Sequence, residues 1–216
     1  MLEGAAAPGA SAAAGRFAAG VGVLDSALRL LGPEGLVVAF NGGKDATAVL
    51  HLARAAVAGL PESRRARVRA VYIPSDDEFP EVDSFVAATA AGFADVELRT
   101  QLGGLQAGLE RVCGEAAASP AAEASEAAGR RLCLGFVLGT KANDPNAAGQ
   151  GVFEPSSQRF PPFWRVNPIL DWSYADVWSF LREHELPYCG MYDEGYTSIG
   201  QRANTRPNPA LAGPGG

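Results

Sequence analysis

Apolar runs bounded by turn residues recur along the chain and alternate with stretches typical of helices. Residues 36–40 form one continuous apolar run, and residues 68–73 form another that is rich in β-branched side chains. A third run, at 132–138, has the same character. Predominantly apolar runs of this length are typical of strands that are buried on both faces of a sheet. We therefore expect buried strands at these positions and a further short strand at 96–98.

Helical patterns separate these runs. Residues 46–58 are strong helix formers, with Asp45 as the expected N-cap and with Gly59 and Pro61 as stop signals. Residues 116–129 are mostly Ala, Glu and Ser, which fits either a helix or a loose insertion. The other expected helices cover 23–31, 80 or 81 to 91, 102–115 and, with Asp171 or Ser173 as the cap, 174–185.

Strands that alternate with helices predict an α/β fold, in which a mostly parallel, Rossmann-like sheet lies between two layers of helices. We expect a single domain over 23–216 whose C-terminal part is rich in loops. Residues 1–22 are rich in Ala and Gly and predict a disordered tail, with an organelle transit peptide as the alternative. Residues 141–164 predict a long loop, and such loops in compact domains are usually functional or disordered.

The net charge and the cysteine pattern limit which binding partners and which compartment we expect. The net charge is −6 and the pI is near 5.0, which disfavours broad nucleic-acid binding because the chain lacks the field that attracts phosphate backbones. No apolar run approaches the length of a membrane span. Cys113, Cys133 and Cys189 form no C-x-x-C pair, which argues against structural zinc and a disulfide framework. We expect a monomer in a reducing compartment, the cytoplasm, without nucleic-acid or membrane partners.

The segment 40–47 carries the clearest chemical pattern. It follows a buried run, contains a pair of glycines and leads into a helix. Glycines let backbone N–H groups approach a phosphate closely, and the N-terminus of a helix adds partial positive charge. Lys44 supplies a full charge and Thr47 a hydroxyl donor, whereas Asp45 suits a place beside a cation such as Mg²⁺ or a cap. The alternative is a tight turn without a ligand, and the order Lys-Asp-Thr favours a phosphate site.

A second polar segment, 138–145, follows the third buried run. Gly139 and Thr140 could bring backbone donors to a nucleotide, and Asp144 could orient a ligand hydroxyl or a metal-bound water. The alternative is a simple turn, because Asn-Asp-Pro is a common turn sequence.

The segment 163–172 combines aromatic, basic and amide residues. Arg165 can pair with a phosphate, Asn167 can bond an amide or carbonyl edge, and an aromatic side chain such as Trp164 can stack on a planar ring. The pattern alone equally fits a strand that enters a capped helix, with its aromatic residues in the core.

The last motif lies at 188–211, where amide and charged side chains stand among turn residues. Arg202 and Arg206 are close in sequence, and two guanidinium groups suit a triphosphate that loses pyrophosphate, or another phosphate group. A surface tail is the alternative, although a tail this rich in Tyr, Asn and Arg is less typical of disorder.

The sequence Asn-Gly-Gly-Lys-Asp at 41–45 resembles the pyrophosphate-binding motif of the adenine nucleotide α-hydrolase superfamily, which includes ATP pyrophosphatases and phosphoadenosine phosphosulfate reductases. That motif usually begins with Ser, and Asn in this place resembles the eukaryotic-type FAD synthase branch. Glu-Phe-Pro-Glu at 78–81 and the stretch 163–211 resemble the same branch. This chain departs from the family in two ways: Lys141 stands where Arg is usual, and 116–129 is its own insertion.

The resemblance implies FAD synthesis from ATP and FMN, with Mg²⁺ as cofactor, and it implies roles for individual residues. The expected catalytic residues are Asn41, Lys44, Asp45, Arg202 and Arg206. ATP and its pyrophosphate are expected to contact Phe40, Asn41, Gly42, Gly43, Lys44, Asp45, Thr47, Gly139, Thr140 and Lys141. FMN is expected to contact Asp144, Trp164, Arg165, Asn167, Asp171, Trp172 and Arg202. Asp45 and Asp144 are the expected ligands of Mg²⁺.

Three other functions compete with this hypothesis. A phosphosulfate reductase needs a nucleophilic cysteine near the C-terminus, commonly in Glu-Cys-Gly-Leu-His, and this sequence has no such segment. An ATP pyrophosphatase acting on tRNA is disfavoured by the acidic balance. A flavin- or nucleotide-binding module without turnover is credible because Lys141 replaces the usual arginine, and lysine offers a point charge instead of a planar fork.

Overall fold

The computed structural model describes residues 8–129, 132–145 and 147–211. Six strands form one sheet in the order β3-β2-β1-β4-β6-β5. They are β1 (Leu36–Ala39), β2 (Val68–Tyr72), β3 (Val96–Thr100), β4 (Gly135–Val137), β5 (Phe153–Pro155) and β6 (Trp164–Val166). Every neighbouring pair is parallel except β5 with β6. The expected mostly parallel sheet is therefore confirmed.

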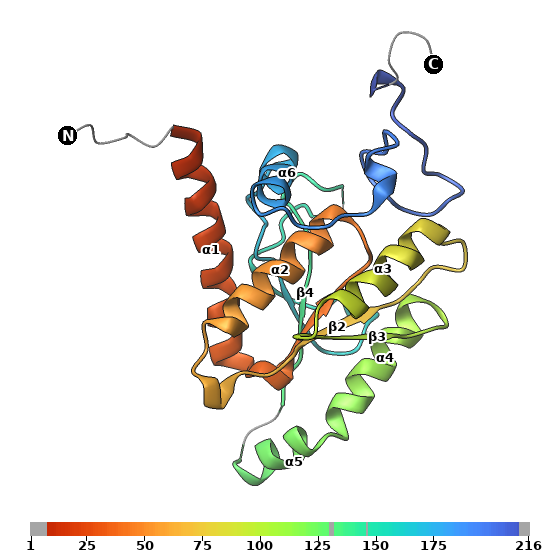
Figure 1. Ribbon diagram of the computed structural model, residues 1–216. Helices are drawn as coiled ribbons and strands as arrows, with labels where there is room; N and C mark the ends of the chain where they lie inside the picture. Colours follow the sequence, from red (N-terminus) through yellow and green to blue (C-terminus); the bar gives the residue numbers. More distant parts are fainter. Residues whose placement is uncertain (1–7, 130–131, 146, 212–216) are drawn as a thin grey trace, which may run out of the picture.

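Helices cover both faces of this sheet (Figure 1). They are α1 (Pro8–Leu31), α2 (Lys44–Ala58), α3 (Pro80–Gly92), α4 (Gly104–Ala117), α5 (Pro120–Ala127) and α6 (Tyr174–Glu183). Helices α1, α2, α3 and α6 pack into one apolar cluster with Val38 of β1, and α4 packs into a second cluster with Val37. Because successive residues of a strand point to opposite faces, the short run in β1 contributes to both layers.

Helix α1 begins much earlier than the sequence pattern predicts. The expectation of a disordered tail over 1–22 is wrong for residues 8–22, which are helical, and residues 1–7 lie outside the described residues. The extended helix is held by contacts at its middle: Phe17 stacks on Phe180 of α6, and Arg16 forms an ion pair of 2.9 Å with Asp176. In the part of the chain that the structure describes, no helix has the length and apolarity needed to cross a membrane.

Two helix starts test the capping expectations. Ser173 caps α6, and its hydroxyl accepts from the backbone N–H of Asp176 at 3.1 Å while the Asp176 side chain accepts from the N–H of Ser173. The expectation for α2 is wrong, because Gly43 is the N-cap and Asp45 lies inside the first turn. Asp45 is thereby free to point its carboxylate at other groups.

His51 of α2 links stability to pH. Its side chain is buried, and its Nδ1 lies 2.9 Å from Nη1 of Arg54. Burial, followed by the positive charge of Arg54, lowers the pKa of His51 from 6.5 to about 4, against the opposing charge of Asp95.

A lowered pKa means that the unfolded chain takes up a proton at a pH where the folded protein does not. His51 therefore contributes stability that is complete above pH 6.5 and is lost as the pH falls toward about 4. Between about pH 7 and about pH 5 we expect the free energy of unfolding to fall by roughly 2 kcal/mol from this group. Urea unfolding at both pH values should show this fall in the native protein and in His184→Gln, but not in His51→Gln. An equal fall in all three would contradict the assignment.

Candidate functional site

A cavity of about 640 Å³ opens where the chain leaves β1 and β4. β1 pairs with β2 on one side and with β4 on the other, so the order of the strands reverses at this point. In open α/β sheets, such a reversal leaves a crevice at the carboxyl ends of the strands, where ligands bind. The segments 40–47 and 138–145, which the sequence analysis singles out, meet at this crevice.

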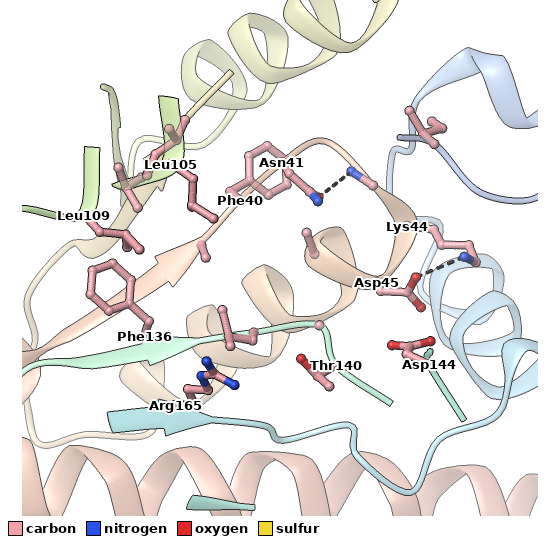
Figure 2. Close-up of a pocket in the computed structure, with 18 of the residues that line it drawn as sticks. Phe40, Asn41, Lys44, Asp45, Leu105, Leu109, Phe136, Thr140, Asp144 and Arg165 are labelled. Atoms are coloured by element: carbon pink, nitrogen blue, oxygen red, sulfur yellow. Dashed lines mark hydrogen bonds and ion pairs between the residues drawn. The ribbon is translucent and has the colours of Figure 1, made fainter. Parts of the chain in front are cut away.

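The cavity has a charged end and an apolar end (Figure 2). Lys44, Asp45 and Asp144 lie at the charged end, close to the start of α2. The apolar end is formed by side chains from β4, from α4 and from the loops around them: Ile73, Leu105, Leu109, Phe136, Phe160 and Phe163. A ligand that fills this cavity would need a polar, charged part and a flat or bulky apolar part.

The loop after β1 is held tightly against α3. Gly42 has a φ of 72°, and a Cβ atom at this position would lie 3.0 Å from Cγ1 of Val82. Side chains other than glycine are therefore disfavoured here both by backbone conformation and by space. The Oδ1 atom of Asn41 accepts from the backbone N–H of Gly43 at 3.0 Å, which fixes the turn. These contacts hold the loop in one conformation at the mouth of the cavity.

Tyr192 closes the start of α2 from the far end of the chain. Its hydroxyl accepts from the backbone N–H of Lys44 at 2.9 Å, and burial raises the pKa of Tyr192 well above its ordinary value. The ammonium of Lys44 lies 5.0 Å from the ring centre of Tyr174 and 5.7 Å from that of Tyr192. Lysine at this distance over an aromatic face is stabilised by the ring's negative face. Lys44 is thus enclosed, and its Nζ donates to Oδ2 of Asp45 at 3.0 Å.

Asp45, Lys141 and Asp144 form a connected charge cluster. Nζ of Lys141 lies 2.9 Å from Oδ1 of Asp45 and 3.1 Å from Oδ1 of Asp144. Burial lowers the pKa of Lys141, but hydrogen bonds and charges from the two aspartates outweigh it, so the pKa lies above its ordinary value. Gly139 makes this approach possible, because a Cβ there would lie 2.8 Å from the carbonyl carbon of Asp45. The segments after β1 and β4 therefore touch backbone to backbone.

These contacts do not fit the expectation that Asp45 and Asp144 hold Mg²⁺. The oxygens that would coordinate the ion are paired with ammonium groups of Lys44 and Lys141. Among the described residues, no group of three or more His, Cys, Asp or Glu side chains is placed to hold a metal. Among the described residues at this end of the cavity, both carboxylates are therefore already paired with ammonium groups.

Arg165 and Trp164 were both expected to contact FMN, but the structure separates them. Arg165 lines the cavity, and its Nη2 donates to the hydroxyl of Ser157 at 2.7 Å. Trp164 is 42% exposed and lines a different cavity, beside Leu30 and Cys133. Neighbouring residues of a strand point to opposite faces, so these two side chains of β6 cannot both face the same ligand.

Three more of the expected FMN contacts lie outside the described lining of the cavity. Asn167 is buried, and its Nδ2 donates to the carbonyl of Gly151 at 2.8 Å, so it braces a loop. Trp172 packs edge-on against Phe180 in the core. Asp171 is exposed at the turn before α6. The pattern at 163–172 thus combines one cavity residue with core and surface residues.

The remaining predicted residues lie at the edges of the site. Thr47 is buried, and its hydroxyl donates to the carbonyl of Gly43 at 3.0 Å, so in this state it bonds the helix. Arg202 and Arg206 are exposed and outside the described lining of the cavity, although their segment reaches it through Ser198 and Ile199. Arg206 donates to the carbonyls of Arg202 and Thr205, both at 2.7 Å.

The sequence pattern did not predict that most of the apolar wall residues, or Tyr192, line the cavity. The wall residues Ile73, Leu105 and Leu109 look like ordinary core positions in a linear pattern, because only the packing of α4 beside β1 brings them to the cavity. Tyr192 had a usable signal, since it lies within the motif at 188–211. Nothing in the pattern indicates that its hydroxyl meets a helix 148 residues earlier.

Comparison with known proteins assigns this chain to a family. The model of the phosphoadenosine phosphosulfate reductase domain matches residues 35–112 and 132–207. The chain therefore belongs to the phosphoadenosine phosphosulfate reductase domain family. The unmatched stretch between the two ranges contains 116–129, which the sequence analysis identifies as an insertion of this chain.

Curated relatives that match most of this chain are FAD synthases, and phosphoadenosine 5'-phosphosulfate reductases match a short stretch of it. A probable FAD synthase of Caenorhabditis briggsae is 36% identical over 177 residues, which cover 82% of this chain and 31% of that protein. A probable FAD synthase of Schizosaccharomyces pombe is 29% identical over 188 residues, covering 85% of this chain and 65% of that protein. This chain thus spans about a third of the length of the first relative and about two thirds of the second.

A solved structure shares the fold. It is an FMN adenylyltransferase of Candida glabrata in complex with FAD and inorganic pyrophosphate, with a TM-score of 0.80 and 21% identity. The likeness covers 97% of this chain and 71% of that one. The three-layer arrangement expected from the sequence is therefore found in a solved protein as well.

The close approach at Gly139 can be tested directly. A methyl group in Gly139→Ala would collide with the backbone of Asp45, so we expect the free energy of unfolding to fall by about 1–3 kcal/mol. In Gly190→Ala the added methyl group meets no atom within 4 Å, and the change should stay within about 0.5 kcal/mol. Urea unfolding of both variants measures the difference. Equal stabilities would show that the two loops are not in tight contact.

Proposed function

We propose that this chain transfers AMP from ATP to FMN, giving FAD and pyrophosphate. The observation that carries the proposal is that one continuous cavity joins the glycine loop after β1 to an apolar, aromatic wall. A nucleotide phosphate chain suits the first part, and a planar flavin ring suits the second. The names of the curated relatives, FAD synthases, support the same reaction.

The charged end suits the phosphates of ATP. Backbone N–H groups at the start of α2 point outward from a helix N-terminus, where partial positive charge favours anions. Gly43 has its N–H bonded to Asn41, and Lys44 has its N–H bonded to Tyr192. In the proposal, a phosphate oxygen replaces Tyr192 at the N–H of Lys44, whereas Asn41 keeps its bond to Gly43 and holds the loop in place for ATP.

The apolar end suits the flavin. Phe136 and Phe163 meet edge-on with ring centres 4.7 Å apart, and they form part of the wall below α4. Arg165 lies between Phe136 and Thr140 in Figure 2, so its guanidinium stands between the two ends of the cavity. A guanidinium there can pair with a flavin phosphate or bond a carbonyl of the ring.

Transfer of AMP to FMN does not require a strong general acid or general base. The phosphate of FMN is already ionised, so it can attack the α-phosphorus of ATP in line while pyrophosphate leaves. The protein contributes by holding the reactants together and by neutralising charge. We assign these roles to Asn41, Lys44 and Arg165 at the cavity, and to Arg202 and Arg206 on the neighbouring segment, whose exposed side chains are able to turn toward a bound triphosphate.

In this proposal, Mg²⁺ reaches the site bound to ATP. The carboxylates of Asp45 and Asp144 are already paired with lysines, so they do not offer a protein cage for the ion. Mg²⁺ commonly keeps several waters and binds through substrate phosphates. We therefore expect the ion to be carried by ATP.

Mixing the protein with ATP, Mg²⁺ and FMN, and separating the products by chromatography, tests the proposal. FAD and pyrophosphate should form in equal amounts and only when all three components are present. A protein that binds FMN and ATP but yields no FAD would be a binding module. Release of AMP and pyrophosphate without FAD would instead indicate an ATP pyrophosphatase.

Asn41→Ala tests the loop. Loss of the amide removes the bond to the N–H of Gly43, so the loop should lose its fixed geometry for ATP. We expect kcat for FAD formation to fall by about 100-fold at saturating substrates. Asn143→Ala removes the same group from an exposed position and should keep the native rate. Full activity of Asn41→Ala would remove this side chain from the mechanism.

Arg165→Met tests the flavin end. Losing a charge-assisted hydrogen bond should raise KM for FMN by about 10-fold or more, with a smaller effect on KM for ATP. Arg159→Met is the matched control, because Arg159 lies over the ring of Phe160 near the same cavity but outside its described lining. Steady-state rates with each substrate varied in turn separate the two constants. A larger effect on ATP than on FMN would reverse the proposed orientation of the substrates.

A further inference from the structure

The chain contains two lysines, and both lie in one charge cluster. Among 18 Lys and Arg residues, the lysines are Lys44 and Lys141, and every other cation is arginine. The ammonium groups of both contact the same carboxylate, Asp45, at 3.0 Å and 2.9 Å. A lysine ammonium is a compact point charge, whereas a guanidinium is a wide planar fork. The smaller group fits where two carboxylates must be bridged closely.

Lys141 is fixed on the side of the carboxylates away from the cavity. Its side chain is 11% exposed, against 23% for Asp45 and 38% for Asp144, and the cavity is lined by the two aspartates. The backbone around it is held as well: the N–H of Lys141 donates to Oδ2 of Asp144 at 2.8 Å, and the N–H of Ala142 donates to the carbonyl of Leu170 at 2.7 Å. The ammonium therefore has a defined position behind the two carboxylates.

The cluster uses every oxygen of both carboxylates. In Asp45, Oδ2 accepts from Lys44 and Oδ1 accepts from Lys141. In Asp144, Oδ1 lies 3.1 Å from Nζ of Lys141, and Oδ2 accepts from the backbone N–H of the same residue. Two negative charges so close would repel each other without a cation, and the two ammonium groups balance both. A divalent ion between the aspartates would have to displace the lysine.

We propose that the ammonium of Lys141 is the resident cation of this site: it positions Asp45 and Asp144 at the cavity and keeps a divalent metal out from between them. Lys141 is thus a positioning residue, since its contacts are with the aspartates. The exclusion of metal follows from the cluster alone. The effect of this positioning on turnover rests on the proposed function.

Binding of Mn²⁺ to the nucleotide-free protein tests the exclusion. Titration calorimetry, or the loss of the free-ion signal in electron paramagnetic resonance, should show no stoichiometric binding to the native protein. Lys141→Met removes the cation and leaves two facing carboxylates, so it should bind one Mn²⁺ per chain, and the double variant with Asp144→Asn should lose that ion. The proposal is overturned if the native protein binds one Mn²⁺ that Asp45→Asn abolishes, or if Lys141→Met gains none.

Circular dichroism shows whether Lys141→Met folds. If it folds poorly, Lys141→Arg provides a second test of the exclusion of metal. Arginine retains the positive charge, so this variant should still exclude Mn²⁺. Arg64→Met, which removes an exposed cation beside a different cavity, is the control for loss of charge and should also show no Mn²⁺ binding. Stoichiometric binding to Lys141→Arg that depends on Asp144 would contradict the role of the ammonium charge.

FAD formation tests the positioning. In Lys141→Met, displaced carboxylates should lower kcat by about 10-fold to 100-fold with little change in either KM, and Lys141→Arg should recover part of the rate. A loss caused by poor folding would instead scale with the folded fraction and leave kcat per folded molecule unchanged. If the native protein forms no FAD, the proposed function is contradicted, but the exclusion of metal still stands. An active native protein with an equally active Lys141→Met would remove the positioning alone.

Discussion

Parallel pairing of β1 with β4 is the constraint on which the site depends. It aligns Val38 with Val137 and so sets the segments that follow these strands against each other, although Asp45 and Lys141 are 96 residues apart in the chain. β1 also pairs with β2, so the order of the strands reverses at β1 and β4, and a crevice remains at the carboxyl ends of these strands. The glycine loop, the charge cluster and the apolar wall all take their places from this one strand pair.

The sequence predicts β1, β2, β3, β4 and the glycine turn before α2 because those features are local, whereas β5 lies within 141–164, which the sequence predicts as a long loop. A buried parallel strand is a continuous apolar run, and a glycine pair between such a run and a helix marks a tight turn. Helix α1 is different, since its Ala- and Gly-rich first half has no strong pattern and is held by distant contacts such as Phe17 with Phe180. Helix formation there is decided by tertiary packing, which composition does not reveal.

The candidate site is predicted less completely because tertiary packing decides which side chains reach the cavity. Arg165 and Trp164 are adjacent in the sequence, and both side chains could contact a flavin phosphate or ring. Because successive residues of a strand point to opposite faces, Arg165 faces the cavity and Trp164 faces solvent. Lys44 and Lys141 look like phosphate ligands in a linear motif. Their ammonium groups are instead engaged by Asp45, a pairing that only the contact of the two loops creates. A bound phosphate would therefore compete with an internal ion pair.

The hydrogen bond from the N–H of Lys44 to the hydroxyl of Tyr192 has a consequence for how the molecule forms. It joins positions 148 residues apart in a chain of 216 residues. Closing so long a loop costs entropy that is recovered only after the sheet has assembled. All six strands end by Val166, so the residues of the whole sheet are synthesised before Tyr192. A growing chain therefore contains the strands of the site before it contains the residue that closes the start of α2.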